Sequence, residues 1–112
     1  MLTPRYTRQF DRDVKRMQRR KKNLEKLKIV IRSLITEQPL DAIHRDHGLV
    51  GTWHGRRECH IESDWLLIYS HDLTQVTFER TGSHSDLFQS TMNSFAPVRV
   101  EERWGSALSA TW

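Results

Sequence analysis

The sequence has few of the features that mark secreted or membrane-spanning proteins. One cysteine among 112 residues excludes an internal disulfide and fits a reducing compartment. There is no run of about 18 apolar residues, so the sequence predicts no membrane-spanning helix. The first ten residues also lack the apolar core of a secretory signal. We therefore expect a cytoplasmic protein with no membrane partner.

Common catalytic and metal-binding motifs are missing as well. The chain has no Cys-x-x-Cys or His-Glu-x-x-His motif, no glycine-rich phosphate loop and no Ser-His-Asp pattern. A zinc site is one alternative, and its candidate ligands are His44, His47, Cys59 and His60. Adjacent Cys59 and His60 would point to opposite faces of a strand, which argues against that alternative. We expect no metal and no other cofactor.

Length and charge are those of one small basic domain. A chain of this length can bury one modest core. Hydrophobic residues make up 37% of it and charged residues 29%, which fits a small soluble protein. Residues 1–32 carry a net charge of +9, whereas residues 33–90 carry a net charge of −5. The basic N-terminal third suggests contact with a polyanion, and the alternative is an ordinary solvated helix surface.

Apolar spacing predicts two N-terminal helices that form a helical hairpin. The repeats consist of Tyr6, Phe10, Val14 and Met17, and then of Leu24, Leu27, Ile31, Leu34 and Ile35. Asn23 is a suitable N-cap for the second helix. Pro39 predicts that this helix ends near Glu37. Residues 2–5 are compatible with an edge strand.

Residues 52–88 predict a β-meander followed by a short helical turn. We expect strands at residues 52–61, 65–70 and 75–81, the second of them apolar throughout and buried on both faces. Residues 84–88 would form the helical turn. The predicted fold class is α+β, with the helical hairpin packed on a twisted, antiparallel-dominated sheet of three to four strands. Residues 1–89 would form the domain, and residues 90–112 a poorly ordered C-terminal extension with at most a short strand around 98–100.

Polar residues of the meander match the needs of acid–base chemistry on RNA. Cleaving an RNA phosphodiester without a metal requires a base for the 2′-OH proton, an acid for the leaving 5′-oxygen and a cation for the transition state. Separate elements supply the candidates His47, His60, Asp64, Arg80 and His84. The turn after residue 61 and the end of the third strand lie at the same end of a meander. We therefore expect these side chains to converge there.

A purely structural reading of the same residues is the alternative. In it, His60 bonds across the sheet to Glu79, and Arg80 pairs with Glu58 or Glu62. The others serve as ordinary loop and turn residues. The remaining histidines are expected on the surface, and they are His44, His54 and His71.

Three runs in the second half of the chain form a specific combined motif. They are DH-x-L-x-G-x-W-x-G-x-R at residues 46–57, H-x-E-x-DW-x-LIY at 60–69 and FERTG-x-H-x-x-LF at 78–88. Together they closely resemble YafQ-type toxins of the RelE/ParE toxin superfamily, and the predicted helical hairpin fits the same family. The resemblance covers about residues 2–88. The residues from Gln89 onward depart from the family pattern.

The resemblance implies a RelE-like fold and the toxin half of a type II toxin–antitoxin pair. Such toxins enter the ribosomal A site and cut the mRNA there by attack of the 2′-OH, without a metal. The implied partners are the ribosome, mRNA and a cognate antitoxin of the RelB/DinJ type, in a toxin–antitoxin complex expected to be heterotetrameric. Two alternatives are a ParE-like toxin that inhibits a topoisomerase by binding, and an inactive homologue that only binds its antitoxin.

The resemblance also implies roles for individual residues. The family's catalytic positions correspond to His47, His60, Asp64, Arg80 and His84 in this sequence. His84 would protonate the leaving oxygen, and His60 or Asp64 would take the 2′-OH proton. His47 would assist them, and Arg80 would hold the phosphate.

Two aromatic residues are implied as substrate contacts. Phe88 matches a family position and would stack on a base. Trp65 fits beside the catalytic residues, and plain core packing is an equal alternative for it.

Overall fold

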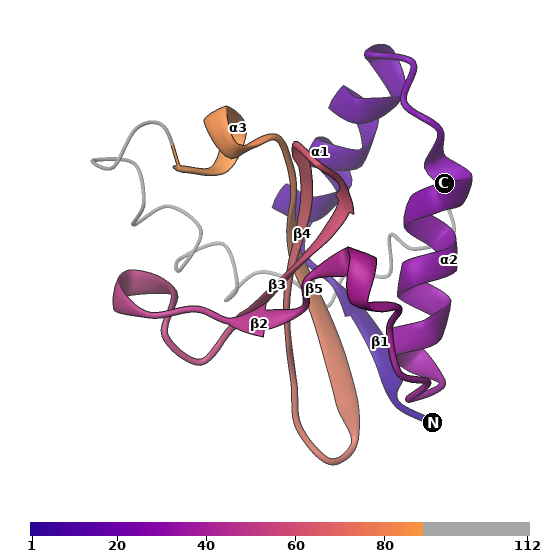
Figure 1. Ribbon diagram of the computed structural model, residues 1–112, viewed down its shortest axis with the longest axis vertical. Coiled ribbons are helices and arrows are strands. Elements are labelled where there is room, and N and C mark those ends of the chain that lie inside the picture. The colour runs from indigo at the N-terminus through magenta and orange to yellow at the C-terminus, as the bar shows by residue number, and fades with distance from the viewer. Residues whose placement is uncertain (89–112) are drawn as a thin grey trace.

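Five strands form one mixed sheet, and two long helices pack on one of its faces (Figure 1). This computed structural model describes residues 1–88, so the expected C-terminal extension and its short strand lie outside the described residues. From one edge to the other, the strands are β1 (Thr3–Tyr6), β5 (Gln75–Gly82), β4 (Trp65–His71), β3 (Arg57–Glu62) and β2 (His47–Gly48). β1 runs parallel to β5, and all other neighbours are antiparallel.

The two helices are α1 (Arg8–Arg19) and α2 (Leu24–Ile35). Each begins at a capping residue, because the side chains of Thr7 and Asn23 accept a backbone N–H group from the first helical turn. The predicted helical hairpin is therefore confirmed. Helix α2 ends at Ile35, close to the predicted position, and the chain enters the left-handed region at Glu37, with φ at 61°.

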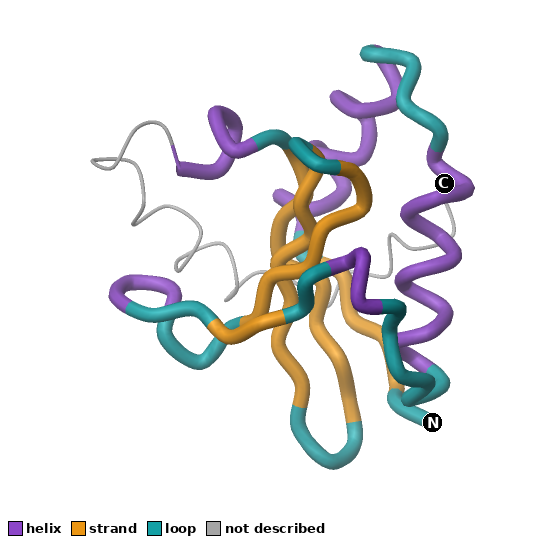
Figure 2. Tube along the Cα trace, in the orientation of Figure 1, coloured by secondary structure: helices purple, strands orange, loops and turns teal. Residues whose placement is uncertain are grey.

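The main core lies between these helices and the sheet. Figure 2 shows the strands in the centre of the molecule with α2 running along one side of them. The helices contribute Phe10, Val14, Met17, Leu27, Val30 and Ile31, and the sheet contributes Cys59, Ile61, Trp65, Leu67, Tyr69, Val76 and Phe78. Full burial of a large apolar side chain stabilises a fold by about 1.5–3 kcal/mol. This face therefore supplies most of the stability.

A smaller apolar cluster covers part of the opposite face. It consists of Trp53, Leu66, Ile68 and Leu87, with Leu49 and Phe88 packed at its edge. These residues come from the 3-10 helix η2 (Gly51–Trp53), from β4 and from the short helix α3 (His84–Phe88). Successive residues of β4 thus enter different clusters, which confirms that this strand is buried on both faces.

The sheet differs from the prediction in detail. The α+β class is confirmed, but the sheet has five strands within residues 1–88 rather than three to four. The segment His47–Gly48, predicted as a loop, pairs with β3 as the short strand β2. The strand predicted from residue 52 is wrong at its start, because η2 and the turn at Gly55 (φ 91°) precede it. None of the helices within residues 1–88 combines the length and apolar character needed to cross a membrane.

Candidate active site

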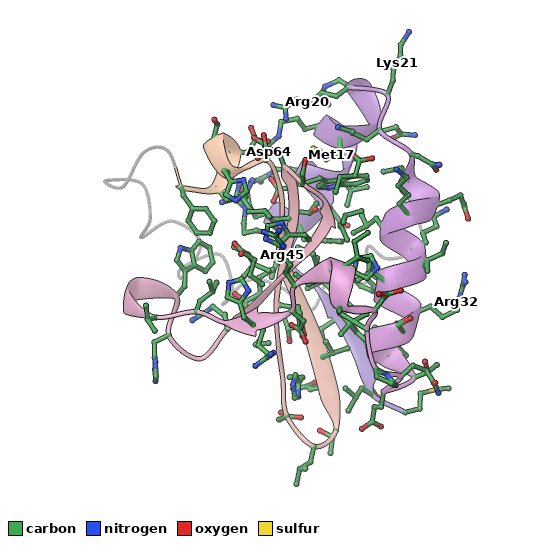
Figure 3. All side chains as sticks on the ribbon, in the orientation of Figure 1. Met17, Arg20, Lys21, Arg32, Arg45 and Asp64 are labelled. Atoms are coloured by element: carbon green, nitrogen blue, oxygen red, sulfur yellow. The ribbon has the colours of Figure 1, made fainter. Side chains whose placement is uncertain are left out.

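The sequence-predicted residues occupy adjacent rows of the sheet and the turn above them. One row holds His47, Glu58, Ile68 and Arg80. The next row on the same face of the sheet holds His60, Leu66 and Gly82. Asp64 lies in the β3–β4 turn close to α3, which begins at His84 (Figure 3). We call the following six residues the rim: His47, Glu58, His60, Asp64, Arg80 and His84.

His84 and Asp64 form the first imidazole–carboxylate pair. Nδ1 of His84 lies 2.6 Å from Asp64 Oδ1, and the backbone N–H of His84 donates to the same oxygen at 2.8 Å. The two bonds from His84 hold the pKa of Asp64 below its usual value, first through the backbone donor and then through the ring. Asp64 therefore stays ionised and fixes the ring with its proton on Nδ1. This leaves Nε2 of His84 to exchange a proton with a substrate.

Glu58 lies close to two further imidazoles, although the sequence did not indicate it as a site residue. Its Oε1 lies 3.2 Å from Nε2 of His47 and 3.5 Å from Nε2 of His60, and its side chain is only 8% exposed. Nδ1 of His47 faces the backbone oxygen of Arg45 at 2.7 Å. A signal existed, because Glu58 and His60 are two positions apart in a strand and must share a face. The bond from His60 to Glu79 that was considered does not form, because Glu79 instead accepts from Arg56 and Ser70.

The ring of His60, next to Glu58, faces the ring of His84, next to Asp64. The ring centroids of His60 and His84 are 5.8 Å apart, with the ring planes tilted by 59°. His60 is largely enclosed, with 13% of its side chain exposed, whereas the His84 side chain is 53% exposed. A cavity of about 390 Å³ lies beside His60, next to the 3-10 helix η1 (Ala42–His44). The predicted convergence of these side chains is thus present, with one enclosed imidazole opposite an accessible one.

Arg80 pairs with a residue that the sequence did not indicate. Its Nε donates to Asp13 Oδ2 at 2.7 Å and its Nη2 to Asp13 Oδ1 at 3.2 Å, so the contact is two-pronged. The pairing of Arg80 with Glu58 or Glu62 that was considered does not occur. Glu58 instead contacts imidazoles, and Glu62 accepts from Lys22 and Lys26. Arg80 is therefore held from α1, across the edge of β5.

Of the two predicted substrate contacts, only Phe88 reaches the surface. Trp65 is fully buried in the helix-side core, and its indole N–H donates to Thr81 Oγ1 at 2.9 Å. The expectation that Trp65 contacts substrate is therefore wrong, because no part of its ring is accessible. Phe88 is half-buried and lies edge-on to Trp53, with ring centroids 6.0 Å apart.

The remaining histidines do not extend the rim. His54 and His71 are exposed, as expected, and His44 turns inward so that its Nδ1 lies 2.7 Å from the backbone oxygen of His60. In the described part of the chain, no group of three or more His, Cys, Asp or Glu residues is arranged to hold a metal. Cys59 lies in the helix-side core, where burial raises the pKa of its thiol. The ligands of the zinc alternative are therefore not brought together.

Fold and rim define a class: a small α+β protein with imidazole–carboxylate pairs gathered at one end of its sheet. The sequence model of the family described as "Bacterial toxin of type II toxin-antitoxin system, YafQ" matches residues 2–89. The mRNA interferase toxin YafQ of Escherichia coli strain K12 is 45% identical over 84 residues, which cover 74% of this chain and 91% of that protein.

Solved structures agree with this assignment. A chain of the E. coli DinJ–YafQ complex matches with a TM-score of 0.74 and 43% identity, covering 79% of this chain and 99% of that one. A metal-bound toxin from Helicobacter pylori matches with a TM-score of 0.74 and 39% identity, covering 79% and 100%. The chain belongs to the YafQ family of toxins from type II toxin–antitoxin systems, as the resemblance implied.

Proposed function

We propose that this toxin is a ribosome-dependent endoribonuclease that cleaves mRNA in the A site by metal-independent acid–base catalysis. The observation that carries the proposal is the pair of imidazoles, His60 and His84, which face each other at 5.8 Å with a carboxylate behind each. RNA cleavage needs one group to take a proton and another to give one. Two such groups contribute about 10²- to 10⁴-fold each to a rate.

In the proposed mechanism, His60 is the base. Nε2 of His60 lies 3.5 Å from Glu58 Oε1, and a neutral ring with its proton on Nε2 keeps a lone pair on Nδ1 that can take the 2′-OH proton. The 2′-oxygen then attacks the adjacent phosphorus. Asp64 is the less suitable base, because its lowered pKa makes it a weak proton acceptor and its oxygen already accepts two bonds from His84.

His84 is the proposed acid. Its Nε2 gives a proton to the 5′-oxygen as the P–O5′ bond breaks, and Asp64 stabilises the ring on its Nδ1 side. The products are a 2′,3′-cyclic phosphate and a free 5′-OH. His47 has acceptor oxygens at both ring nitrogens, an arrangement that the doubly protonated ring satisfies. Together with Arg80 it would offset charge on the phosphorane-like transition state.

The proposed partners follow from charge and from the relatives. Basic side chains of the helical hairpin, among them Lys21 in the α1–α2 turn and Arg32 in α2, project away from the molecule (Figure 3) and suit contact with ribosomal RNA. The related toxin of E. coli forms a DinJ–YafQ complex. We expect a DinJ-type antitoxin for this chain, in a heterotetrameric complex, and a cytoplasmic location.

Primer extension on mRNA programmed into purified ribosomes tests this function. The parent protein should cut within the A site codon and should not cut free mRNA at a comparable rate. It should keep its rate when bound metal is first stripped from it with EDTA and the EDTA is removed before ribosomes are added. His60→Gln and His84→Gln should each abolish most of the cleavage, whereas His54→Gln and His71→Gln, which change exposed histidines outside the rim, should not.

Other outcomes identify the alternatives. If both rim variants cut as fast as the parent, the nuclease assignment to these residues is wrong. Inhibition of a topoisomerase without RNA cleavage would indicate the ParE-like binding toxin. A parent protein that neither cuts RNA nor arrests growth would indicate an inactive homologue. Loss of cleavage by the EDTA-stripped toxin that added zinc or copper restores would contradict metal independence.

A further inference from the structure

A fully buried carboxylate lies behind the rim on helix α1. The Asp13 side chain has no exposed surface. Placing an isolated charge in such a position is strongly destabilising unless donors surround it. Donors do surround this one, and they come from Gln9, Arg16, Arg80 and Thr81. The buried charge is therefore compensated by residues of both α1 and β5.

Helical spacing places the charged residue Asp13 on the buried face of α1, beside apolar residues. Phe10, Val14 and Met17 form the buried stripe of α1, and Asp13 lies on that same face, three residues after Phe10. An apolar residue here would extend the core. The sequence instead directs a carboxylate at the edge of β5 beyond the end of β1, where the backbone N–H of Thr81 donates to it at 3.1 Å.

The contact with Arg80 is the strongest of the set. Arg80 meets Asp13 through Nε at 2.7 Å and through Nη2 at 3.2 Å, and two parallel bonds fix the plane of a guanidinium. Arg80 is only 11% exposed on its side chain, so this contact governs its orientation. Oδ1 of Asp13 is shared with Arg16, whose Nη2 lies at 3.0 Å, so the carboxylate is itself held in place.

We propose that Asp13 is a positioning residue for the cleavage reaction, which acts by fixing the guanidinium of Arg80 at the rim. The inference rests on the proposed function, because it assigns Arg80 to the phosphate. A cation that is already oriented stabilises a transition state without the reorganisation that a mobile side chain would need. Helix α1 then has two roles. It covers the sheet, and it supplies the residue that orients the guanidinium of Arg80.

The test uses Asp13→Asn, which keeps the shape and one acceptor oxygen but removes the charge. Cleavage of ribosome-bound mRNA is measured under single-turnover conditions, giving a rate at saturation and a half-saturating toxin concentration. We expect the saturated rate to fall about tenfold or more, with half-saturation within about twofold of the parent. Asp13→Asn combined with Arg80→Gln should be no slower than Arg80→Gln alone, because Asp13 acts through Arg80.

Asp11→Asn is the matched control. Asp11 is a second buried aspartate of α1, placed beside Tyr6 in β1, and the change is chemically the same. The control should cleave at the parental rate. Circular dichroism at the assay temperature shows that each variant is folded. A purely structural role for Asp13 would lower the thermal stability of Asp13→Asn without slowing the folded enzyme.

A measurement on the parent covers the case in which Asp13→Asn does not fold. In a ¹H–¹⁵N spectrum, Arg80 Nε–H should exchange slowly with water and be as ordered as the backbone, in contrast to exposed Arg12. An Arg80 signal as mobile as that of Arg12 would overturn the inference, and so would a parental rate for Asp13→Asn or multiplicative effects in the double variant. If Arg80→Gln, His60→Gln and His84→Gln all cleave normally, the proposed function itself fails.

Discussion

The two faces of the central strands use the same backbone for different purposes. On the helix side, β3 presents Cys59 and Ile61 to a dry apolar core. On the other side, the same strand presents Glu58 and His60, with Glu58 Oε1 3.5 Å from Nε2 of His60. One strand thus supports both packing and a polar site because its side chains alternate between faces.

The difference between these faces concerns what each can tolerate. A close-packed apolar face loses stability when volume is removed. The rim face has enclosed polar groups that depend on one another, so a change there alters protonation and orientation more than folding. Substitutions on the two faces should therefore separate activity from stability, and the following experiments examine that separation.

His84→Gln should have the largest effect on activity. The ring is exposed and contacts Asp64 and His60, so its loss should lower the cleavage rate by about 10²- to 10⁴-fold while changing the unfolding free energy by no more than about 0.5 kcal/mol. Ribosome-programmed cleavage and urea unfolding measure the two quantities, with His71→Gln as control. A large loss of stability in His84→Gln would contradict the expected difference between the two faces.

Phe78→Ala should show the opposite behaviour. Phe78 is fully buried and packs against Tyr6 and Phe10 on the helix side, so its truncation should cost about 3–5 kcal/mol of unfolding free energy. Cleavage per folded molecule at low temperature should stay within about twofold of the parent. Leu73→Ala, at an exposed turn, is the control and should change neither quantity. A rim that failed in a folded Phe78→Ala protein would show that the faces are coupled.

Glu58→Gln should have an intermediate effect on rate. The amide keeps an acceptor oxygen but loses the charge that both His47 and His60 face, so we expect cleavage to slow by about ten- to a hundredfold. Glu37→Gln makes the same chemical change at an exposed site that pairs with the N-terminus. Equal rates for Glu58→Gln and the parent would show that the carboxylate between the imidazoles has no catalytic role.

Acid pH should produce the smallest and most gradual effect, through Asp86 in α3. Hydrogen bonds from Arg20 hold the pKa of Asp86 well below its usual value of 3.8. A carboxyl group with a depressed folded-state pKa binds fewer protons folded than unfolded, so its stabilisation is complete above the unfolded pKa. That stabilisation is lost as the pH falls below about 4 toward the folded pKa.

Urea midpoints measured between pH 7 and pH 3 should therefore fall for the parent protein. The decrease should be shallower for Asp86→Asn, which lacks the titrating group. Glu25→Gln, an exposed change on α2, controls for the loss of one negative charge. Parallel curves for the parent and Asp86→Asn would show that the link between α3 and Arg20 does not contribute to acid stability.

Local sequence signals predicted most of the fold. Apolar periodicity located both helices, and the apolar run of β4 predicted a strand buried on two faces. The failures have physical causes. Gly55 and the 3-10 turn before it interrupt an alternation that looked continuous from residue 52. β1 was only compatible with a strand by itself, because its pairing partner lies about 70 residues away in β5.

Some residues of the candidate site could likewise be predicted from the sequence, and others could not. His60, Asp64 and His84 could be proposed from residue type and meander topology, and the structure brings them into contact. The role of Trp65 could not be assigned from the sequence. A Trp that contacts substrate and a Trp that packs in the core below the site have the same position in the sequence pattern. Only its complete burial decided the question.

The sequence by itself determined the α+β class, the end of the sheet where the histidines gather and the family to which the chain belongs, because periodicity, turn residues and motif spacing are local properties. Only the tertiary structure decided which carboxylate meets which cation or imidazole. The Arg80–Asp13 contact joins residues 67 positions apart. Its formation depends on how α1 crosses the edge of β5, and packing of the whole chain sets that geometry.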